Sequence, residues 1–175
     1  TPVDNGPRLI LKFRSDSTQV RLNGQGQPQL TLPAGHAAQN PRFNTMSSHY
    51  VEFAPTAWTL PGTGSVVYHA PETTAGGANA IDFNQSVNAG QNGTFLNIPL
   101  SQLAAGTYEY LRVSLAYQNY NINFRYTDTQ FGQGAMDLTG TLASFIGFNT
   151  YIGTFNVGQQ SVTVNDDKLQ GFWAF

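Results

Sequence analysis

Residues 106–126, GTYEYLRVSLAYQNYNINFRY, carry the clearest alternation of apolar and polar positions in the chain. Its first half has an apolar set at every second residue: Leu111, Val113, Leu115 and Tyr117. Successive side chains of a β-strand point to opposite faces, so this pattern predicts a strand with one buried face. After Gln118–Asn119 the parity changes, and the apolar set becomes Tyr120, Ile122, Phe124 and Tyr126. A regular ladder cannot change parity without turning core side chains outward, so we expect a β-bulge or tight turn at Gln118–Asn119.

Shorter apolar runs bounded by glycine and proline predict further strands at residues 9–13, 49–53, 65–69, 94–98 and 150–157. Residues 135–146 begin as a strand, and residues 141–148 fit either a strand or a short helix. Residues 24–41 contain closely spaced Gly and Pro and predict a long ordered loop, with Leu30 and Leu32 inserted into the core. Residues 161–164 and 169–175 predict a hairpin across the turn-favouring tetrad at 165–168.

Short strands at roughly ten-residue spacing, separated by turn residues, indicate an all-β fold, an antiparallel β-sandwich with long Gly/Pro loops. A closed β-barrel is the alternative. The length of 175 residues predicts one domain at residues 9–175, with residues 1–8 as an N-terminal arm or tether.

Composition points to an exported protein. Charged residues make up 10% of the chain, against about a quarter in typical domains, and amides and hydroxyls supply the remaining polarity. We therefore expect the protein to be extracellular, at the cell surface or in the periplasm, with Thr1 following a cleavage site or marking an artificial chain start. The eight Lys and Arg residues are scattered, which argues against nucleic acid as a partner. No run of 18 apolar residues suggests a membrane span.

Two groups of side chains are candidates for metal binding or catalysis. His36, His49 and His69 lie on separate segments and would form a metal site, copper above all, only if they converge; the alternative is one partly buried and two surface histidines. Glu52 and Glu109 are the carboxylates that a glycosidase cleft would need, but a cross-strand ion pair with Arg112 or Arg125 explains a strand glutamate equally well. We therefore expect no catalysis and no required cofactor.

Aromatic residues are the candidate contact groups, because an exposed aromatic row can stack on sugar rings or anchor a protein partner. Those not obviously needed by the core are Trp58, Tyr108, Tyr110, Phe172, Trp173 and Phe175. The alternative is that a second sheet or a loop covers them. The terminal GFWAF can also pair as an edge strand with a neighbouring copy, since little charge opposes that contact.

Three tripeptides match glycosylation acceptors. Asn84 and Asn92 begin N-glycosylation sequons, and Ser17 lies in an Asp-Ser-Thr segment that resembles the O-glycosylation sites of exported Bacteroidetes proteins. Each is a further sign of export.

The order of segments LILKF, RLNGQGQP, MSSHYVEF, VVYHAPET, AIDF and IPLSQLAAGTYEYLRVSLA resembles the MbnP-like domain of exported bacterial proteins, including Bacteroidetes lipoproteins. The resemblance covers residues 9–116. It implies a periplasmic or surface β-sandwich and, for some members, copper bound through histidine and an oxidised tryptophan. No copper-ligand motif of the family aligns with His36, His49, His69 or Trp58.

These observations favour an exported, non-catalytic β-sandwich that acts by surface contact, as an adhesion, extracellular-matrix or self-assembling structural subunit. Its expected partners are other copies of itself, another surface protein, or carbohydrate. The alternative is an MbnP-like copper-binding protein, and a carbohydrate-binding module or glycosidase is less favoured.

Overall fold

The structure is a computed structural model that describes residues 6–128, 130, 132, 134–146, 149–168 and 172–174, with only the backbone of Phe172 and Trp173. Its largest sheet has the strand order β12-β9-β8-β2-β3, and β6 pairs with β2 outside this path. The bounds are β2 (Arg42–Ala54), β3 (Ser65–His69), β6 (Ala89–Gly90), β8 (Tyr110–Asp128), β9 (Gly134–Phe145) and β12 (Phe172–Ala174).

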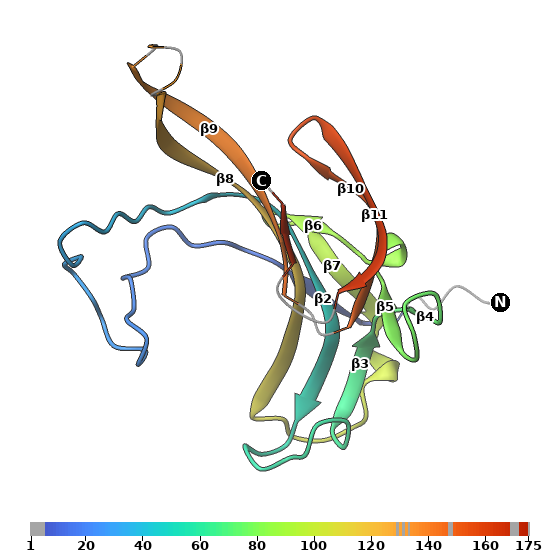
Figure 1. The fold of residues 1–175 in the computed structure, drawn as a ribbon. Helices are drawn as coiled ribbons and strands as arrows, with labels where there is room; N and C mark the ends of the chain where they lie inside the picture. The colour runs from blue at the N-terminus through green and yellow to red at the C-terminus, as the bar shows by residue number, and fades with distance from the viewer. Residues whose placement is uncertain are drawn as a thin grey trace.

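Two smaller sheets form the second layer (Figure 1). One pairs β1 (Arg8–Lys12) with β7 (Thr94–Pro99), and the other has the order β11-β10-β5-β4. The remaining elements are β4 (Glu72–Thr73), β5 (Ala80–Asp82), β10 (Thr150–Val157), β11 (Gln160–Lys168) and two 3-10 turns, η1 (Phe83–Gln85) and η2 (Leu100–Gln102). The predicted all-β sandwich is confirmed. The described sheets have open edges, so the closed barrel is excluded.

The core consists of two hydrophobic clusters, one under each part of the second layer. The first contains Phe83, Tyr117, Phe145, Ile152 and Phe155, which join β8 and β9 to β10. The second is built from side chains of β2, β6 and β7: Val51, Ala89, Phe95 and Leu96. The β1–β7 sheet and the β11-β10-β5-β4 sheet therefore each pack on a different part of the largest sheet.

Strand β8 is continuous where a break was expected. Gln118 and Asn119 pair regularly with Ser144 and Ala143 of β9, so the predicted bulge or turn at these two residues is wrong. The register shifts lie in the pairing of β8 with β2, on either side of this point. One of these shifts leaves Ala116 as an extra residue of β8, between the partners of Ser47 and Ser48. Leu111 and Val113 are 49% and 38% exposed, so the first apolar set does not form the buried face that its alternation predicted.

Two loop predictions are also wrong. Leu30 is 84% exposed and Leu32 is exposed too, so neither is inserted into the core. Residues 165–168 belong to β11 rather than to a turn, and the reversal lies at residues 158–159, between β10 and β11. Asn165 has a φ of 52° beside a register shift, which explains the misleading signal, because asparagine tolerates left-handed backbone at bulges as well as in turns.

Candidate functional site

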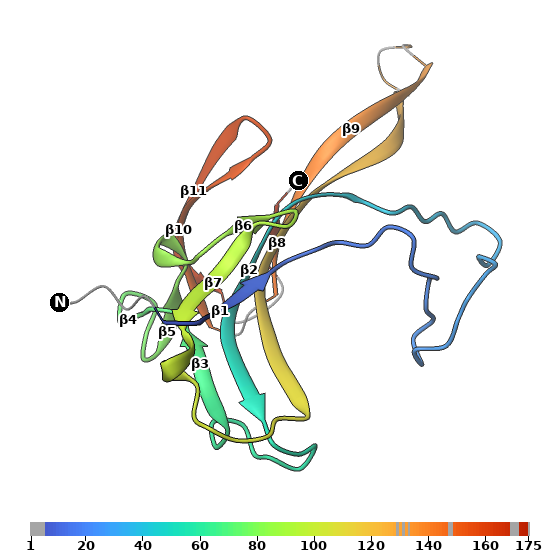
Figure 2. The same ribbon diagram turned by 180° about the vertical axis from the view of Figure 1, so that it is seen from behind.

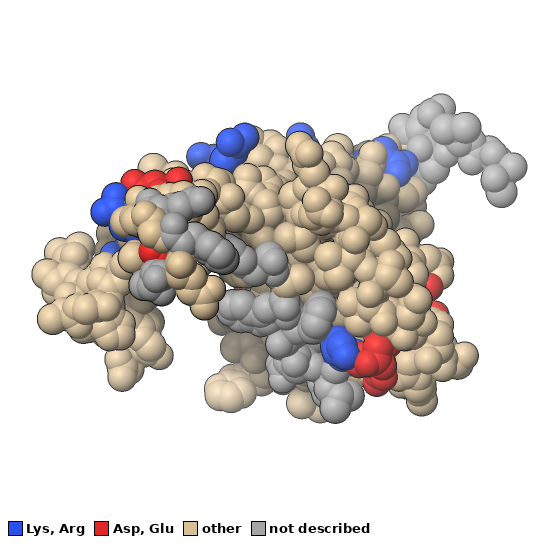
Figure 3. Space-filling view, turned by 45° about the horizontal axis from the view of Figure 1, so that its top comes forward, with Lys and Arg blue, Asp and Glu red and all other residues tan. Residues whose placement is uncertain are grey.

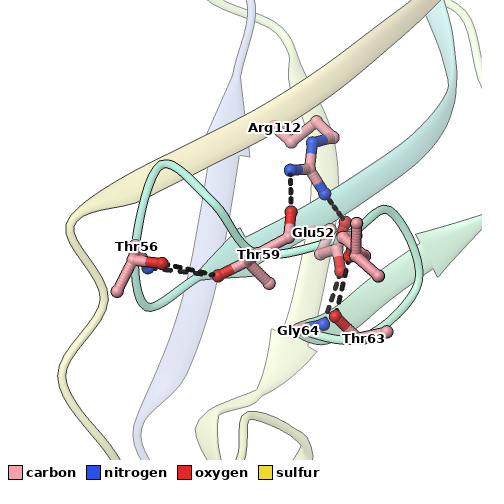
Figure 4. A network of polar contacts seen from close by, with 7 residues as sticks. Glu52, Thr56, Thr59, Thr63, Gly64 and Arg112 are labelled. Atoms are coloured by element: carbon pink, nitrogen blue, oxygen red, sulfur yellow. Dashed lines mark hydrogen bonds and ion pairs between the residues drawn. The ribbon is translucent and has the colours of Figure 1, made fainter.

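A buried ion pair connects the central strands to a surface loop (Figure 4). Glu52 of β2 is 0% exposed and lies opposite Arg112 of β8 in the ladder. Arg112 donates one hydrogen bond from Nη1 to the Glu52 carboxylate and another from Nη2 to the Thr59 carbonyl, at 2.8 Å. The Gly64 backbone N–H donates to Glu52 Oε1 at 2.6 Å. Glu52 therefore holds the loop of residues 55–64 against the sheet.

The carboxylate of Glu52 is kept ionised by its hydrogen bonds. Burial, the largest influence, acts to raise the pKa of Glu52. Hydrogen bonds from the backbone N–H of Gly64 and from the Arg112 guanidinium outweigh it and hold the pKa below its ordinary value. A carboxylate with these partners and no exposure is a structural group, and the cross-strand ion pair expected as the alternative for Glu52 is confirmed.

The lowered pKa of Glu52 predicts a stability contribution that disappears in acid. In the unfolded chain, glutamate has a pKa of about 4.3. The contribution of Glu52 to stability is therefore complete above that pH and is lost as the pH falls through the lower pKa of the folded state. Urea unfolding of wild type and Glu52→Gln between pH 7 and pH 2.5 measures it. We expect wild type to be the more stable at neutral pH and the difference to shrink below about pH 4. A difference that is constant or grows in acid would contradict this assignment.

Glu109 does not join Glu52 in a cleft. It is exposed and immediately precedes β8, where its backbone N–H donates to the Ala54 carbonyl. Arg125, the other arginine considered, pairs with Asp137 of β9 through two hydrogen bonds of 2.7 and 2.9 Å. The geometry gives no pair of carboxylates from Glu52 and Glu109 for glycoside hydrolysis.

The three histidines do not converge. His36 is exposed in the loop of residues 13–41. His49 lies in the middle of β2, next to Tyr50, which pairs with His69 at the end of β3. Burial and, secondarily, the charge of His69 lower the pKa of His49, which favours its neutral form. Within the described residues, no group of three or more His, Asp or Glu side chains is placed to hold a metal ion. The copper alternative stays a prediction.

The aromatic candidates have different environments. Trp58 is 91% exposed in the loop held by Glu52, and Tyr110 is half-exposed at the start of β8. Tyr108 packs edge-on against Phe53, with ring centroids 5.7 Å apart, and donates its hydroxyl proton to the Ala104 carbonyl, so it belongs to the interior contacts of the subunit. The backbone of Phe172 and Trp173 forms the edge strand β12, while their side chains, and Phe175 entirely, lie outside the described residues.

The glycosylation candidates all lie on the surface. Ser17 and Asn92 are exposed in loops, and Asn92 has a φ of 58°. Asn84 is exposed in η1, beside β10. Whether any of them is modified stays a prediction.

The outer part of β8 and β9 is an amphipathic two-stranded hairpin that projects from the sandwich (Figures 1 and 2). Among the described residues, the pairing of β2 with β8 stops at Asn121, and that of β12 with β9 covers residues 143–145 of β9. One face beyond these points is apolar, with the side chains Ile122, Phe124, Tyr126, Met136 and Leu138. Tyr126 is 49% and Leu138 41% exposed, so the apolar set predicted to face the core is only partly covered.

The loop of residues 13–41, here termed the arm and distinct from the N-terminal residues 1–8, projects from the same side of the sandwich (Figures 1 and 2). Two glutamine side chains fasten its ends: the amide of Gln39 bonds to the backbone of Asn123, and the amide of Gln91 bonds to the backbone of Ser15. Between them the arm exposes four aliphatic side chains, Val20, Leu22, Leu30 and Leu32.

A cleft of about 610 Å³ separates the β8–β9 face from β10 and η1. Its distinguishing residues are six asparagines: Asn44, Asn84, Asn88, Asn119, Asn121 and Asn156. The sequence contained a signal for part of this site in the alternating Asn119, Asn121 and Asn123 of β8. The pattern indicates a polar strand face but not that β10 stands opposite it.

Comparison with known proteins identifies no relative: no protein-family model matches the chain, and no curated protein or solved structure is significantly similar to it. The resemblance to MbnP-like domains therefore stays a prediction. No helix among the described residues is long and apolar enough to cross a membrane.

Proposed function

We propose that the protein is a non-catalytic, exported β-sandwich that acts by surface contact, as a subunit that assembles with copies of itself. The observation that carries the proposal is the projecting hairpin with one apolar face, beside an arm that also exposes aliphatic side chains. In the assembly, the arm of one copy covers the apolar hairpin face of another.

Physical reasoning supports a partner for this hairpin. A two-stranded hairpin is marginally stable in water by itself and needs a third strand or a packed face. The apolar face is at its most exposed at Tyr126 and Leu138, where no third strand of the described residues pairs with either β8 or β9. Apolar side chains of the arm have the chemistry to cover that face.

The sparse charge of the surface favours contacts between identical copies. Figure 3 shows Lys, Arg, Asp and Glu in a few small groups on a mostly uncharged face. The formal net charge is −2, so long-range repulsion between copies is weak. The same amide-rich, low-charge composition supports an extracellular, cell-surface or periplasmic location.

Sedimentation and light scattering over a concentration series test the proposal. Leu138→Lys on the hairpin and Leu30→Lys on the arm should each weaken self-association by at least about tenfold, because each buries a charge in an apolar contact. Ala135→Lys is the matched control: this exposed residue lies on the opposite, polar face of the same hairpin, and its substitution should leave association unchanged.

Cysteine cross-linking tests the contact itself. The chain contains no cysteine, so Leu30→Cys and Leu138→Cys proteins each carry a single thiol. When the two variants are mixed and oxidised, we expect the 30–138 heterodimer to predominate over either homodimer. A protein that stays monomeric up to its solubility limit, or that associates equally well with either lysine substitution, would overturn the proposal.

A further inference from the structure

The asparagine cleft has the lining of a neutral binding site. Asn44, Asn119 and Asn121 form one wall on the β2–β8 face, and Asn156 stands on β10 across from them. Three buried rings, Phe83, Tyr117 and Phe155, pack together at its base. None of the described residues that line the cleft carries a charge.

Hydrogen bonds hold the amides of the β8 wall in fixed orientations. Asn44 Nδ2 donates to Asn121 Oδ1 at 2.8 Å and to Asn119 Oδ1 at 2.9 Å. Thr141 Oγ1 also donates to Asn121 Oδ1, and Asn119 Nδ2 donates to the Tyr117 hydroxyl, both at 2.9 Å. Among the described residues, the side-chain nitrogen Nδ2 of Asn121 and the side-chain oxygen Oδ1 of Asn44 have no hydrogen-bond partner. The wall therefore presents an oriented donor beside an oriented acceptor.

We propose that this cleft binds a neutral carbohydrate. Sugar hydroxyls both donate and accept, so they match side-chain amides that offer both functions in fixed positions. Amides that are already oriented lose little conformational entropy on binding. The volume of about 610 Å³ lies in the range of small-molecule sites.

The same features disfavour other ligand classes. Phosphate or carboxylate groups bind most strongly to arginine, lysine or helix N-termini, and the described lining offers no charged partner of that kind. A peptide bound as an added strand needs a free strand edge. The β8 wall presents side chains from a sheet face, since Asn119 and Asn121 lie within β8, between β2 and β9. On the β10 wall, the backbone carbonyl of Asn156 already accepts a hydrogen bond from Asn119 Nδ2 at 3.3 Å. The cleft lies on the face of β8 opposite the apolar hairpin face, and the exposed aliphatic side chains of the arm do not line it, so it is a second function of the same subunit.

Binding to neutral saccharides tests the inference. Calorimetry and ¹⁵N-resolved NMR would use β1,4-linked oligomers of glucose, mannose, galactose and N-acetylglucosamine, with sialylated and sulfated glycans and a strand-forming peptide as comparison ligands. We expect at least one neutral oligosaccharide to bind and to shift the side-chain NH₂ signals of Asn44 and Asn121. The self-association of the protein should not change when the saccharide binds.

Substitutions on both walls locate the site. Asn121→Ala and Asn156→Ala should each weaken binding by at least about tenfold, because each leaves sugar hydroxyls without partners. The Asn156 side chain makes no hydrogen bond to a described residue, so its loss leaves the sheet intact even if Asn121→Ala disturbs folding. Asn97→Ala on β7, outside the cleft, is the control and should bind normally.

Three results would overturn the inference: no neutral saccharide binds, binding survives both cleft substitutions, or only anionic glycans or the peptide bind. Loss of self-association in the hairpin and arm variants leaves the cleft intact, so the two proposals fail independently.

Discussion

Replacing Arg112 with alanine is expected to lower the free energy of unfolding by about 3–5 kcal/mol. The substitution leaves the Glu52 carboxylate, which is 0% exposed, without its ionic partner. It also removes the hydrogen bond to the Thr59 carbonyl and so loosens the loop of residues 55–64. The cost arises chiefly from an uncompensated buried charge, so chemical denaturation at neutral pH measures it directly.

Arg125→Ala is the matched control for this experiment. Arg125 lies on the same strand and pairs with Asp137 of β9, but the two side chains are 68% and 71% exposed. Water screens such a pair, and its loss should cost no more than about 1 kcal/mol.

A double mutant gives a second test, because Arg112→Ala should cost much less when Glu52 is already glutamine. Equal losses at Arg112 and Arg125, or additive losses at Arg112 and Glu52, would show that burial of Glu52 does not control the effect.

Phe145→Ala is expected to lower the free energy of unfolding by about 3–5 kcal/mol as well. The ring is 1% exposed and packs against Phe83, Tyr117 and Phe155 at centroid distances of 4.8, 4.8 and 4.9 Å. Three aromatic neighbours cannot all collapse into the space of the missing ring, so a cavity remains.

Trp58→Ala is the control for Phe145, because it removes a larger ring that is 91% exposed. Its effect on unfolding should stay within about 0.5 kcal/mol. If Phe145→Ala destabilises the protein no more than Trp58→Ala does, the aromatic cluster is not the main core of this half of the sandwich.

Local sequence patterns predicted the strands well where propensity and end signals agreed. The strand at residues 65–69 matches β3, and the strand at residues 150–157 matches β10. The first is closed by Pro71, and the second runs into Gly158, which adopts a φ of 58°. Such signals lie within a few residues of the strand they end, so one sequence is enough to read them.

The candidate surfaces could not be predicted because each depends on which segments meet in space. Alternation showed that residues 120–126 include an apolar face. It did not show that the pairing of β8 with β2 stops at Asn121 of β8, which leaves part of that face uncovered. Leu30 and Leu32 looked like core residues because aliphatic side chains in a loop usually need cover. The three histidines and Glu109 had side chains suited to a metal site or a glycosidase cleft, but the fold does not bring the partners of either site together.

Strand β8 contributes Tyr117 to the first hydrophobic cluster and pairs along its other edge with β2, which carries Val51 of the second cluster. Fraying of either half of the sandwich removes ladder bonds from the strand that the other half also needs. The two halves therefore melt as one cooperative unit, although the second layer is divided. The arm stands outside this unit, so its length and sequence can diverge at little cost to folding.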